Sequence, residues 1–244
     1  SVFDPFGDYC HAGYLRNSLR ERDLVIVKRI EHELFRAQLG KATSYLAELS
    51  DITYADFLKV HEILFSELYP WAGQDRSVLT PDTAVRKGEV IFCSPMDCRR
   101  AVDYALRLGQ NPNEMRRRPG QVMGLFAFGH PFLDGNGRAM LVVHSELCFR
   151  SNFSIRWEDT DKQQYLDALS KEIANPNDGV LDSYLSTYLA PSLERQEWQN
   201  TMHELRGLSG VDVVQDTSAP YDQPETRAAY LEFERKRAYR IPSS

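Results

Sequence analysis

The most informative stretch of this 244-residue chain is His130-Pro131-Phe132-Leu133-Asp134-Gly135-Asn136-Gly137-Arg138. It contains an imidazole, a carboxylate, a Gly-Asn-Gly turn and an arginine within nine residues. The residues that follow, 139–143, are typical of the first turns of a helix. A glycine-rich turn at a helix N-terminus offers unpaired backbone N–H groups and the positive end of the helix dipole to an anion. The stretch therefore predicts a loop that holds a diphosphate and moves a proton beside it.

The side chains of this loop suit that chemistry. His130 has an unperturbed pKa near neutrality, so it can accept a proton from a hydroxyl group. Asp134 supplies a hard oxygen for Mg²⁺, which commonly binds one or two carboxylates together with substrate phosphates. Residues 135–137 allow the backbone to approach an anion closely, and Arg138 offers a planar fork of donors to phosphate oxygens. Phe132 is expected to anchor the loop on the core.

The full stretch resembles the signature loop of the Fic (filamentation induced by cAMP) domain family. The family pattern reads His-x-Phe-x-Asp/Glu-Gly-Asn-Gly-Arg-x-x-Arg, and the chain matches every specified position except the last. The resemblance covers roughly residues 8 to 190. It implies a mostly α-helical fold with a small β-hairpin, the flap, which clamps a target peptide beside the loop.

Two further segments extend the resemblance. Tyr14-Leu15-Arg16-Asn17 is similar to an N-terminal Leu-x-Asn segment, and Tyr69-Pro70-Trp71-Ala72-Gly73-Gln74-Asp75-Arg76 is similar to a Trp-Ala-Gly-x-x-Arg stretch before the flap. Residues 77–94 are then expected to form the flap. Residues 77–80 and 90–93 are its predicted strands, because they are rich in β-branched or aromatic side chains.

One position departs from the family pattern, since Leu141 replaces the second arginine. In the family that arginine contacts the terminal phosphate of ATP and pairs with a glutamate of an inhibitory Ser/Thr-x-x-x-Glu-Gly/Asn motif. That motif is missing from the chain, because Glu48 is followed by Leu49 and Glu158 by Asp159. We therefore expect the usual glutamate inhibition not to operate. Control by a separate inhibitory partner protein stays open, as does a donor other than ATP.

Composition is typical of a globular catalytic domain. The chain is 42% hydrophobic with a formal charge of −6, which argues against general nucleic-acid binding. No apolar run approaches the ~20 residues needed to span a membrane. The four cysteines show no zinc-binding spacing, and the basic run 116–118 is expected to be solvated. The expected location is the cytoplasm, or a host cell if the chain is a piece of a secreted effector.

Hydrophobic periodicity and capping residues predict a series of helices. Ser94-Pro95-Met96-Asp97 is a typical helix start, and Thr53 with Asp56 is a typical cap. The predicted helices are residues 18–38, 53–68, 94–108, 119–128, 138–150, 160–173, 178–189, 193–208 and a short one near 226–239. Residues 1–192 are expected to form the catalytic domain, and residues 193–244 a C-terminal helix and charged tail.

Several other side chains are expected to lie outside the chemistry. His61 and His144 are interpreted as packing or surface residues, although His144 lies about one helical turn beyond Leu141. Glu146 is expected to be a solvated helix carboxylate, and Lys87 a solvent-facing residue of the flap.

The resemblance implies a Mg²⁺-dependent transferase that moves a nucleoside monophosphate, most readily AMP from ATP, onto a hydroxyl side chain of a target protein bound along the flap. His130 would be the general base, Asp134 the metal ligand, residues 135–137 the phosphate cradle, and Arg138 both a catalytic and a phosphate-binding residue. Two alternatives remain: a transferase using another diphosphate donor, such as UTP or CDP-choline, and a non-catalytic nucleotide-binding module. A nuclease or phosphatase activity is less consistent with the sequence, because no second carboxylate cluster suits a two-metal site.

Overall fold

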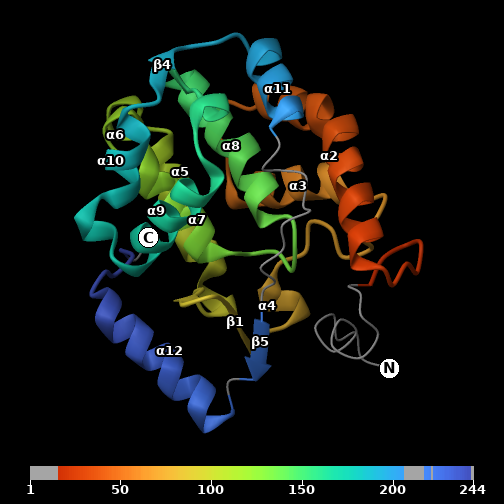
Figure 1. Ribbon diagram of the computed structural model, residues 1–244, viewed down its shortest axis with the longest axis vertical. Coiled ribbons are helices and arrows are strands. Elements are labelled where there is room, and N and C mark those ends of the chain that lie inside the picture. The colour runs from red at the N-terminus through yellow and green to blue at the C-terminus, as the bar shows by residue number, and fades with distance from the viewer. Residues whose placement is uncertain (1–15, 206–216, 221, 243–244) are drawn as a thin grey trace.

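Helices make up most of the protein. The computed structural model describes residues 16–205, 217–220 and 222–242. Figure 1 shows the helices gathered around α7 and α8. The helices are α2 (Leu24–Ala47), α3 (Tyr54–Phe65), α4 (Arg76–Leu79), α5 (Cys98–Gly109), α6 (Pro112–Arg117), α7 (Pro119–Gly129), α8 (Asn136–Arg150), α9 (Lys162–Ala174), α10 (Val180–Ser186), α11 (Arg195–Glu204) and α12 (Pro224–Arg237).

Two small antiparallel sheets accompany the helices. The first has the strand order β2-β1-β5, formed by β1 (Thr83–Lys87), β2 (Val90–Ile91) and β5 (Thr217–Pro220). The second pairs β3 (Phe153–Ile155) with β4 (Leu189–Pro191). The predicted mostly α-helical fold with a β-hairpin is thus confirmed.

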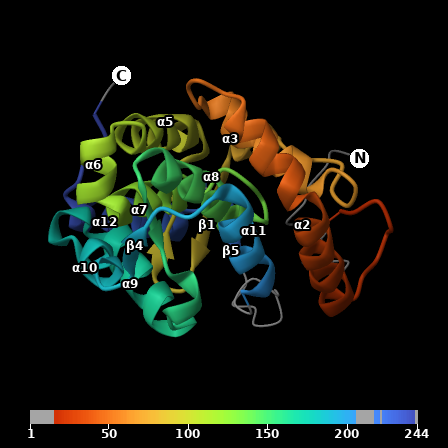
Figure 2. The same cartoon turned by 90° about the horizontal axis from the view of Figure 1, so that it is seen from above.

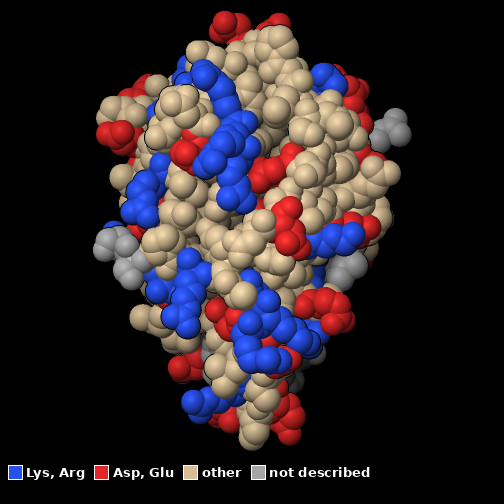
Figure 3. Space-filling model, turned by 90° about the vertical axis from the view of Figure 1, so that its left-hand side faces the viewer, with Lys and Arg blue, Asp and Glu red and all other residues tan. Residues whose placement is uncertain are grey.

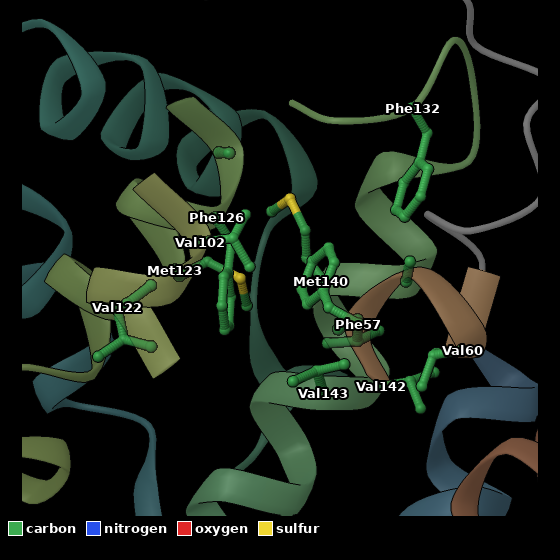
Figure 4. Packing of buried hydrophobic residues seen from close by; sticks show 14 of the residues in the cluster. Phe57, Val60, Val102, Val122, Met123, Phe126, Phe132, Met140, Val142 and Val143 are labelled. Carbon is green, nitrogen blue, oxygen red and sulfur yellow. The ribbon is translucent and has the colours of Figure 1, made fainter. Parts of the chain in front are cut away.

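The core is built around α7. Every residue of this helix is buried, as expected for a helix whose sequence is apolar on all sides. Helices α5, α8, α9 and α10 all contact α7. Phe57 of α3 joins the core to the loop that follows α7, because its ring lies 5.0 Å from Phe126 and 5.9 Å from Phe132 between centroids. Figure 4 shows these aromatic rings with Met140 and Val143 of α8.

Several predicted helix boundaries are confirmed by their caps. Thr53 and Asp56 form the expected capping box at the start of α3. Pro95 lies in a 3₁₀ turn (Pro95–Asp97) that continues into α5, although the Ser94 side chain makes no capping hydrogen bond. The start of α2 was predicted six residues too early, because Asp23 is the residue whose carboxylate accepts the N–H groups of Val25 and Ile26. Figure 2 shows α2 and α3 packed side by side.

The predicted first strand of the flap is wrong. Residues 76–79 form the short helix α4, because the Asp75 carboxylate accepts the backbone N–H groups of Ser77 and Val78 and so starts a helical turn. The strand begins at Thr83 instead. The hairpin between β1 and β2 turns at Gly88, which has a positive φ of 57°.

Three more boundaries differ from prediction. Asn111 caps α6, so the expected loop after α5 is mostly helical. Asp161, rather than Thr160, caps α9. Helix α10 ends at Ser186, and the chain then continues into β4. Cys10, Tyr14 and Leu15 lie outside the described residues, and so do residues 206–216, 221 and 243–244 of the predicted C-terminal helix and tail.

The C-terminal elements pack on the rest of the protein. Arg195 of α11 donates to the buried carboxylate of Glu146 on α8 at 2.9 and 3.0 Å. Arg237 at the end of α12 is 2% exposed, lies 3.6 Å above the Phe128 ring, and donates to the carbonyl of Ile173 at 2.9 Å. Strand β5 pairs along β1 (Figure 1).

The surface carries charges of both signs. On the face shown in Figure 3, lysine and arginine side chains alternate with acidic side chains and uncharged areas. Among the described residues, no helix has the length and apolar character needed to cross a membrane.

Candidate active site

The candidate catalytic loop joins the end of α7 to the start of α8. His130 ends α7 with a left-handed backbone (φ 39°) and donates its N–H to the Phe126 carbonyl at 3.1 Å. Gly135, with φ 77°, precedes the first turn of α8. The predicted residues thus form the connection between two packed helices, and the last three of them belong to the first turn of α8. Figure 1 shows this loop between α7 and α8.

The His130 ring is fixed against the flap. The side chain is 7% exposed and stacks on Phe92, with the ring centroids 3.6 Å apart and the planes 3° apart. Phe92 follows β2 and donates its N–H to the Val85 carbonyl of β1 at 3.0 Å. The predicted base therefore lies beside the sheet that the family resemblance assigns to the target peptide.

Asn136 sets the orientation of the His130 ring. Its amide oxygen accepts the Phe132 N–H at 2.9 Å, and its amide nitrogen donates to the Phe132 carbonyl at 2.7 Å. These two bonds fix which end of the amide faces the imidazole, so the NH₂ group lies 3.3 Å from His130 Nε2. That arrangement favours an unprotonated Nε2, the form that can accept a proton.

Two glycines of the loop differ in their surroundings. A Cβ on Gly135 would lie 2.7 Å from Phe65 Cε2 and 3.1 Å from His61 Nε2, so only glycine fits both the space and the positive φ. Gly137 lies inside α8 without a positive φ, and a Cβ there would meet nothing within 4 Å. Open space thus borders the N-terminus of α8, where backbone N–H groups favour an anion.

Asp134 forms an ion pair with Lys28 of α2. Its Oδ2 contacts the Lys28 ammonium, while its Oδ1 accepts the Gly135 N–H at 2.8 Å. Burial raises the pKa of this carboxyl, but the positive charges of Lys28 and Arg138 outweigh burial and hold that pKa below its usual range. The carboxylate is therefore ionised at neutral pH.

Arg138 is held by Glu31, which also lies on α2. Glu31 is fully buried, and its Oε1 lies 2.5 Å from Arg138 Nη1. Its Oε2 accepts from the Lys28 ammonium at 3.1 Å and from the Tyr69 hydroxyl at 2.9 Å. One buried carboxylate thus fixes a guanidinium, an ammonium and a phenol in the same cluster.

The site fits a magnesium ion with one protein ligand, the carboxylate of Asp134. The side chain of Asp134 is 26% exposed, so the carboxylate is partly open to solvent, although the Lys28 ammonium contacts its Oδ2. Within the described parts of the chain, no group of three His, Cys, Asp or Glu side chains could hold a metal ion. The remaining ligands would be donor phosphates and water, which is the common arrangement for Mg²⁺.

A second histidine, on α3, supports the loop. His61 is fully buried, donates from Nε2 to the Asp134 carbonyl at 2.8 Å, and accepts the Gly73 N–H on Nδ1 at 3.0 Å. Its ring stacks on Phe132 at 3.8 Å. Burial lowers the pKa of His61 to about 4, so it stays neutral. The expected packing role of His61 and the expected anchoring role of Phe132 are both confirmed.

Arg76 supports the other end of the loop. It is fully buried and donates from Nε to the His130 carbonyl at 2.7 Å and from Nη2 to the Cys93 carbonyl at 2.8 Å. Its backbone N–H donates to the Pro131 carbonyl at 2.8 Å. The side chain thus connects the candidate loop to Cys93, two residues beyond the end of β2.

The other candidate side chains lie outside the loop. Leu141 is 6% exposed in the core. His144 is buried and hydrogen-bonds the Pro119 carbonyl at 2.8 Å, so its packing role is confirmed, and Lys87 is exposed as expected. The expectation for Glu146 was wrong, because it is fully buried and pairs with both Arg150 and Arg195.

Sequence reasoning missed Lys28 and Glu31 as members of this site. Both lie about a hundred residues from the loop, and no local motif connects them to it. One signal was present: Glu31 falls between Val27 and Phe35 at helical spacing, so it is a carboxylate on the buried face of α2. Such a charge is buried only when it is paired.

Comparisons with known proteins match the sequence of this site to a known family. Residues 51–148 match the sequence model of the Fic/DOC family. The protein adenylyltransferase VbhT of Bartonella schoenbuchensis is 25% identical over 167 residues, which is 66% of this chain and 34% of the relative. The probable protein adenylyltransferase y4lH of Sinorhizobium fredii is 25% identical over 187 residues, covering 71% of this chain and 90% of the relative. The chain thus spans only about a third of the first relative's length.

A solved structure shows the same fold. BepC, an effector of Bartonella tribocorum solved with AMPPNP, superposes with a TM-score of 0.62 at 18% identity, covering 78% of this chain and 100% of that chain. The match to the family model confirms the predicted resemblance to the Fic family, and the superposition confirms the predicted helical fold.

Proposed function

We propose that the protein, whose residues 51–148 match the sequence model of the Fic/DOC family, is a Fic-type transferase that moves a nucleoside monophosphate onto a hydroxyl side chain of a target protein. The preferred donor is ATP and the group transferred is AMP. One observation carries the proposal most directly: the amide of Asn136 holds the imidazole of His130 beside a helix N-terminus bordered by open space. A proton acceptor and an anion site thus lie next to each other.

His130 accepts the proton of the target hydroxyl on Nε2, where the incoming hydroxyl replaces the long 3.3 Å contact with the Asn136 amide. As that O–H bond breaks, the oxygen attacks the α-phosphorus of the donor, and the bond from that phosphorus to the diphosphate leaving group breaks. A stacked and hydrogen-bonded imidazole loses little freedom on reacting, which lowers the barrier.

Residues 135–137 and Arg138 hold the phosphates. The backbone at the start of α8 and the guanidinium fixed by Glu31 lie where negative charge builds up on the leaving diphosphate. Asp134 and the donor phosphates would hold Mg²⁺, which would neutralise further negative charge there.

The target peptide is proposed to bind along the flap. Strand β1 is paired on both sides, with β2 and with β5. A target strand would therefore add at β2 or take the place of β5. Strand addition reads the main chain of a target more than its side chains.

Leu141 favours a second candidate donor. An apolar, buried side chain at this position offers no charge to a third phosphate. A donor with only a diphosphate, such as CDP-choline, would not need a positive charge at this position. UTP remains a further candidate.

The test is a labelling experiment with Mg²⁺ and a donor panel of ATP, GTP, UTP, CTP and CDP-choline, read by intact-protein and peptide mass spectrometry. Purified protein and cell lysate are both used, beside His130→Ala and His130→Asn. The asparagine variant matters because asparagine tolerates the left-handed backbone of this position. An adduct that both variants lose supports transfer and its mass identifies the donor. Nucleotide binding without any adduct would support the non-catalytic module.

A further inference from the structure

Four charged side chains form a closed cluster at the donor site. Lys28 and Glu31 come from α2, Asp134 from the loop and Arg138 from the first turn of α8. Two positive and two negative charges cancel within this cluster. A diphosphate entering the site must therefore meet a cation that is released from one of these pairs or brought with it.

Lys28 is the member best able to change partner. Its ammonium has three N–H donors, and the described residues account for two of them, Glu31 and Asp134. Its side chain is 11% exposed, whereas that of Glu31 is 1% exposed. The Glu31 contact spans one helical turn of α2, so it holds the ammonium in place when Asp134 is taken by another cation.

We infer that Lys28 is a phosphate-binding residue of the donor site. The inference rests on the proposed function. Asp134 would hold a divalent cation brought with the donor, and the Lys28 ammonium, which Glu31 also holds, would then be available to a phosphate oxygen. Lys28 thus brings to the diphosphate a positive charge that Leu141 cannot supply on α8.

Three variants of α2 separate this role from a general loss of charge. Lys28→Met keeps the length of the side chain without its charge, and Lys28→Arg keeps the charge. Arg29→Met removes a charge from the neighbouring, exposed position of the same helix. Circular dichroism and melting temperature verify that each variant folds.

The experiment is calorimetric titration with ATP, ADP and AMP at saturating Mg²⁺. The expected result for Lys28→Met is about tenfold weaker binding of ATP and ADP, the size of a charge-assisted hydrogen bond, with AMP binding changed less than about threefold. Lys28→Arg is expected to recover most of the loss, and Arg29→Met is expected to bind as the parent does.

Two results would overturn the inference while leaving the proposed function intact. One is ADP binding by Lys28→Met within about twofold of the parent. The other is tighter binding of ADP or Mg²⁺, which would make Lys28 only a counter-ion of Asp134. If the parent protein bound none of the donor panel, both the inference and the proposed function would fail.

Discussion

His130 and Gly135 hold left-handed backbone at the two ends of the catalytic loop. Such a backbone costs a non-glycine residue about 1 kcal/mol, and it persists where the surroundings fix it. Here the surroundings are the Arg76 hydrogen bond to the His130 carbonyl and the aromatic contacts of Phe92. The imidazole is thus aimed by its backbone as well as by its ring contacts.

Gly135→Ala is expected to destabilise the protein and weaken nucleotide binding. A Cβ would overlap Phe65 and crowd His61, in addition to the cost of the positive φ. We expect a loss of about 2–4 kcal/mol in the free energy of unfolding, measured by urea denaturation.

Gly88→Ala in the flap is the matched control for this prediction. Gly88 also has a positive φ, but a Cβ there meets nothing within 4 Å. Its expected cost is about 1 kcal/mol, from the backbone alone. Equal losses in the two variants would contradict the steric argument.

Glu172 is expected to make stability depend on pH. Burial raises the pKa of this carboxyl to about 7 from an ordinary value of 4.5, although the Leu181 N–H, 3.2 Å from its Oε2, opposes the shift. The folded state therefore keeps a proton that the unfolded chain loses, and the stability it contributes is lost as pH rises from about 4.5 through 7.

Glu172→Gln should remove that dependence. We expect its melting temperature to exceed that of the parent by about 3 °C at pH 8 and to match it at pH 5. Glu33→Gln, at a site whose side chain is 64% exposed, should show no difference at either pH. A parent curve that is flat between pH 5 and pH 8 would count against the raised pKa.

At the scale of elements, the sequence predicted the helix starts that depend on contacts between neighbouring residues. The capping box of α3 and the proline at the start of α7 agree with prediction, because each acts within one helical turn. The prediction of the first flap strand was wrong because a local cap was overlooked. Ser77 and Val78 have β-forming or neutral side chains, but the Asp75 carboxylate accepts their N–H groups. Capping outweighed β propensity.

The candidate site shows the same limit. Its loop residues are consecutive, so the sequence predicted them as one unit. Lys28 and Glu31 meet that loop because α2 packs on α8, and Arg76 meets it through its hydrogen bond to the His130 carbonyl. Contacts of this kind depend on tertiary packing, and a single sequence carries little trace of them.

Arg76→Lys is expected to slow transfer without weakening nucleotide binding. Lysine cannot reproduce the planar fork that reaches both the His130 and Cys93 carbonyls. Displacement of the imidazole should lower kcat by about 10- to 100-fold, while ADP affinity stays within about twofold. Arg86→Lys, on the exposed side of β1 where the guanidinium bonds the Gly88 carbonyl, is the control and should leave kcat unchanged.

At the scale of the whole molecule, α12 and β5 bring the end of the chain to the site. Arg237 anchors α12 by stacking on Phe128, two residues before His130, and by its bond to the Ile173 carbonyl. Strand β5 then pairs with β1 from Thr83 to Arg86. The flap is therefore completed by residues more than 130 positions downstream of β1.

Arg237→Ala is expected to loosen this end of the protein. Removing a buried, hydrogen-bonded guanidinium should cost about 2 kcal/mol in the free energy of unfolding. Hydrogen exchange followed by mass spectrometry should show faster exchange in α12 and β5 than in α7. Arg235→Ala, whose guanidinium forms a surface ion pair with Glu232, should cost less than about 0.5 kcal/mol, and comparable effects of the two variants would refute the anchoring role.

The pairing of β5 with β1 also constrains how the protein can be cut into pieces. A fragment that stops after β4 would keep the catalytic loop and both strands of the hairpin. It would also present the backbone of β1 as a bare edge, open to the same edge of another copy. Self-association of such a fragment would then imitate target binding, so shortened forms of this chain are poor material for finding what the flap recognises.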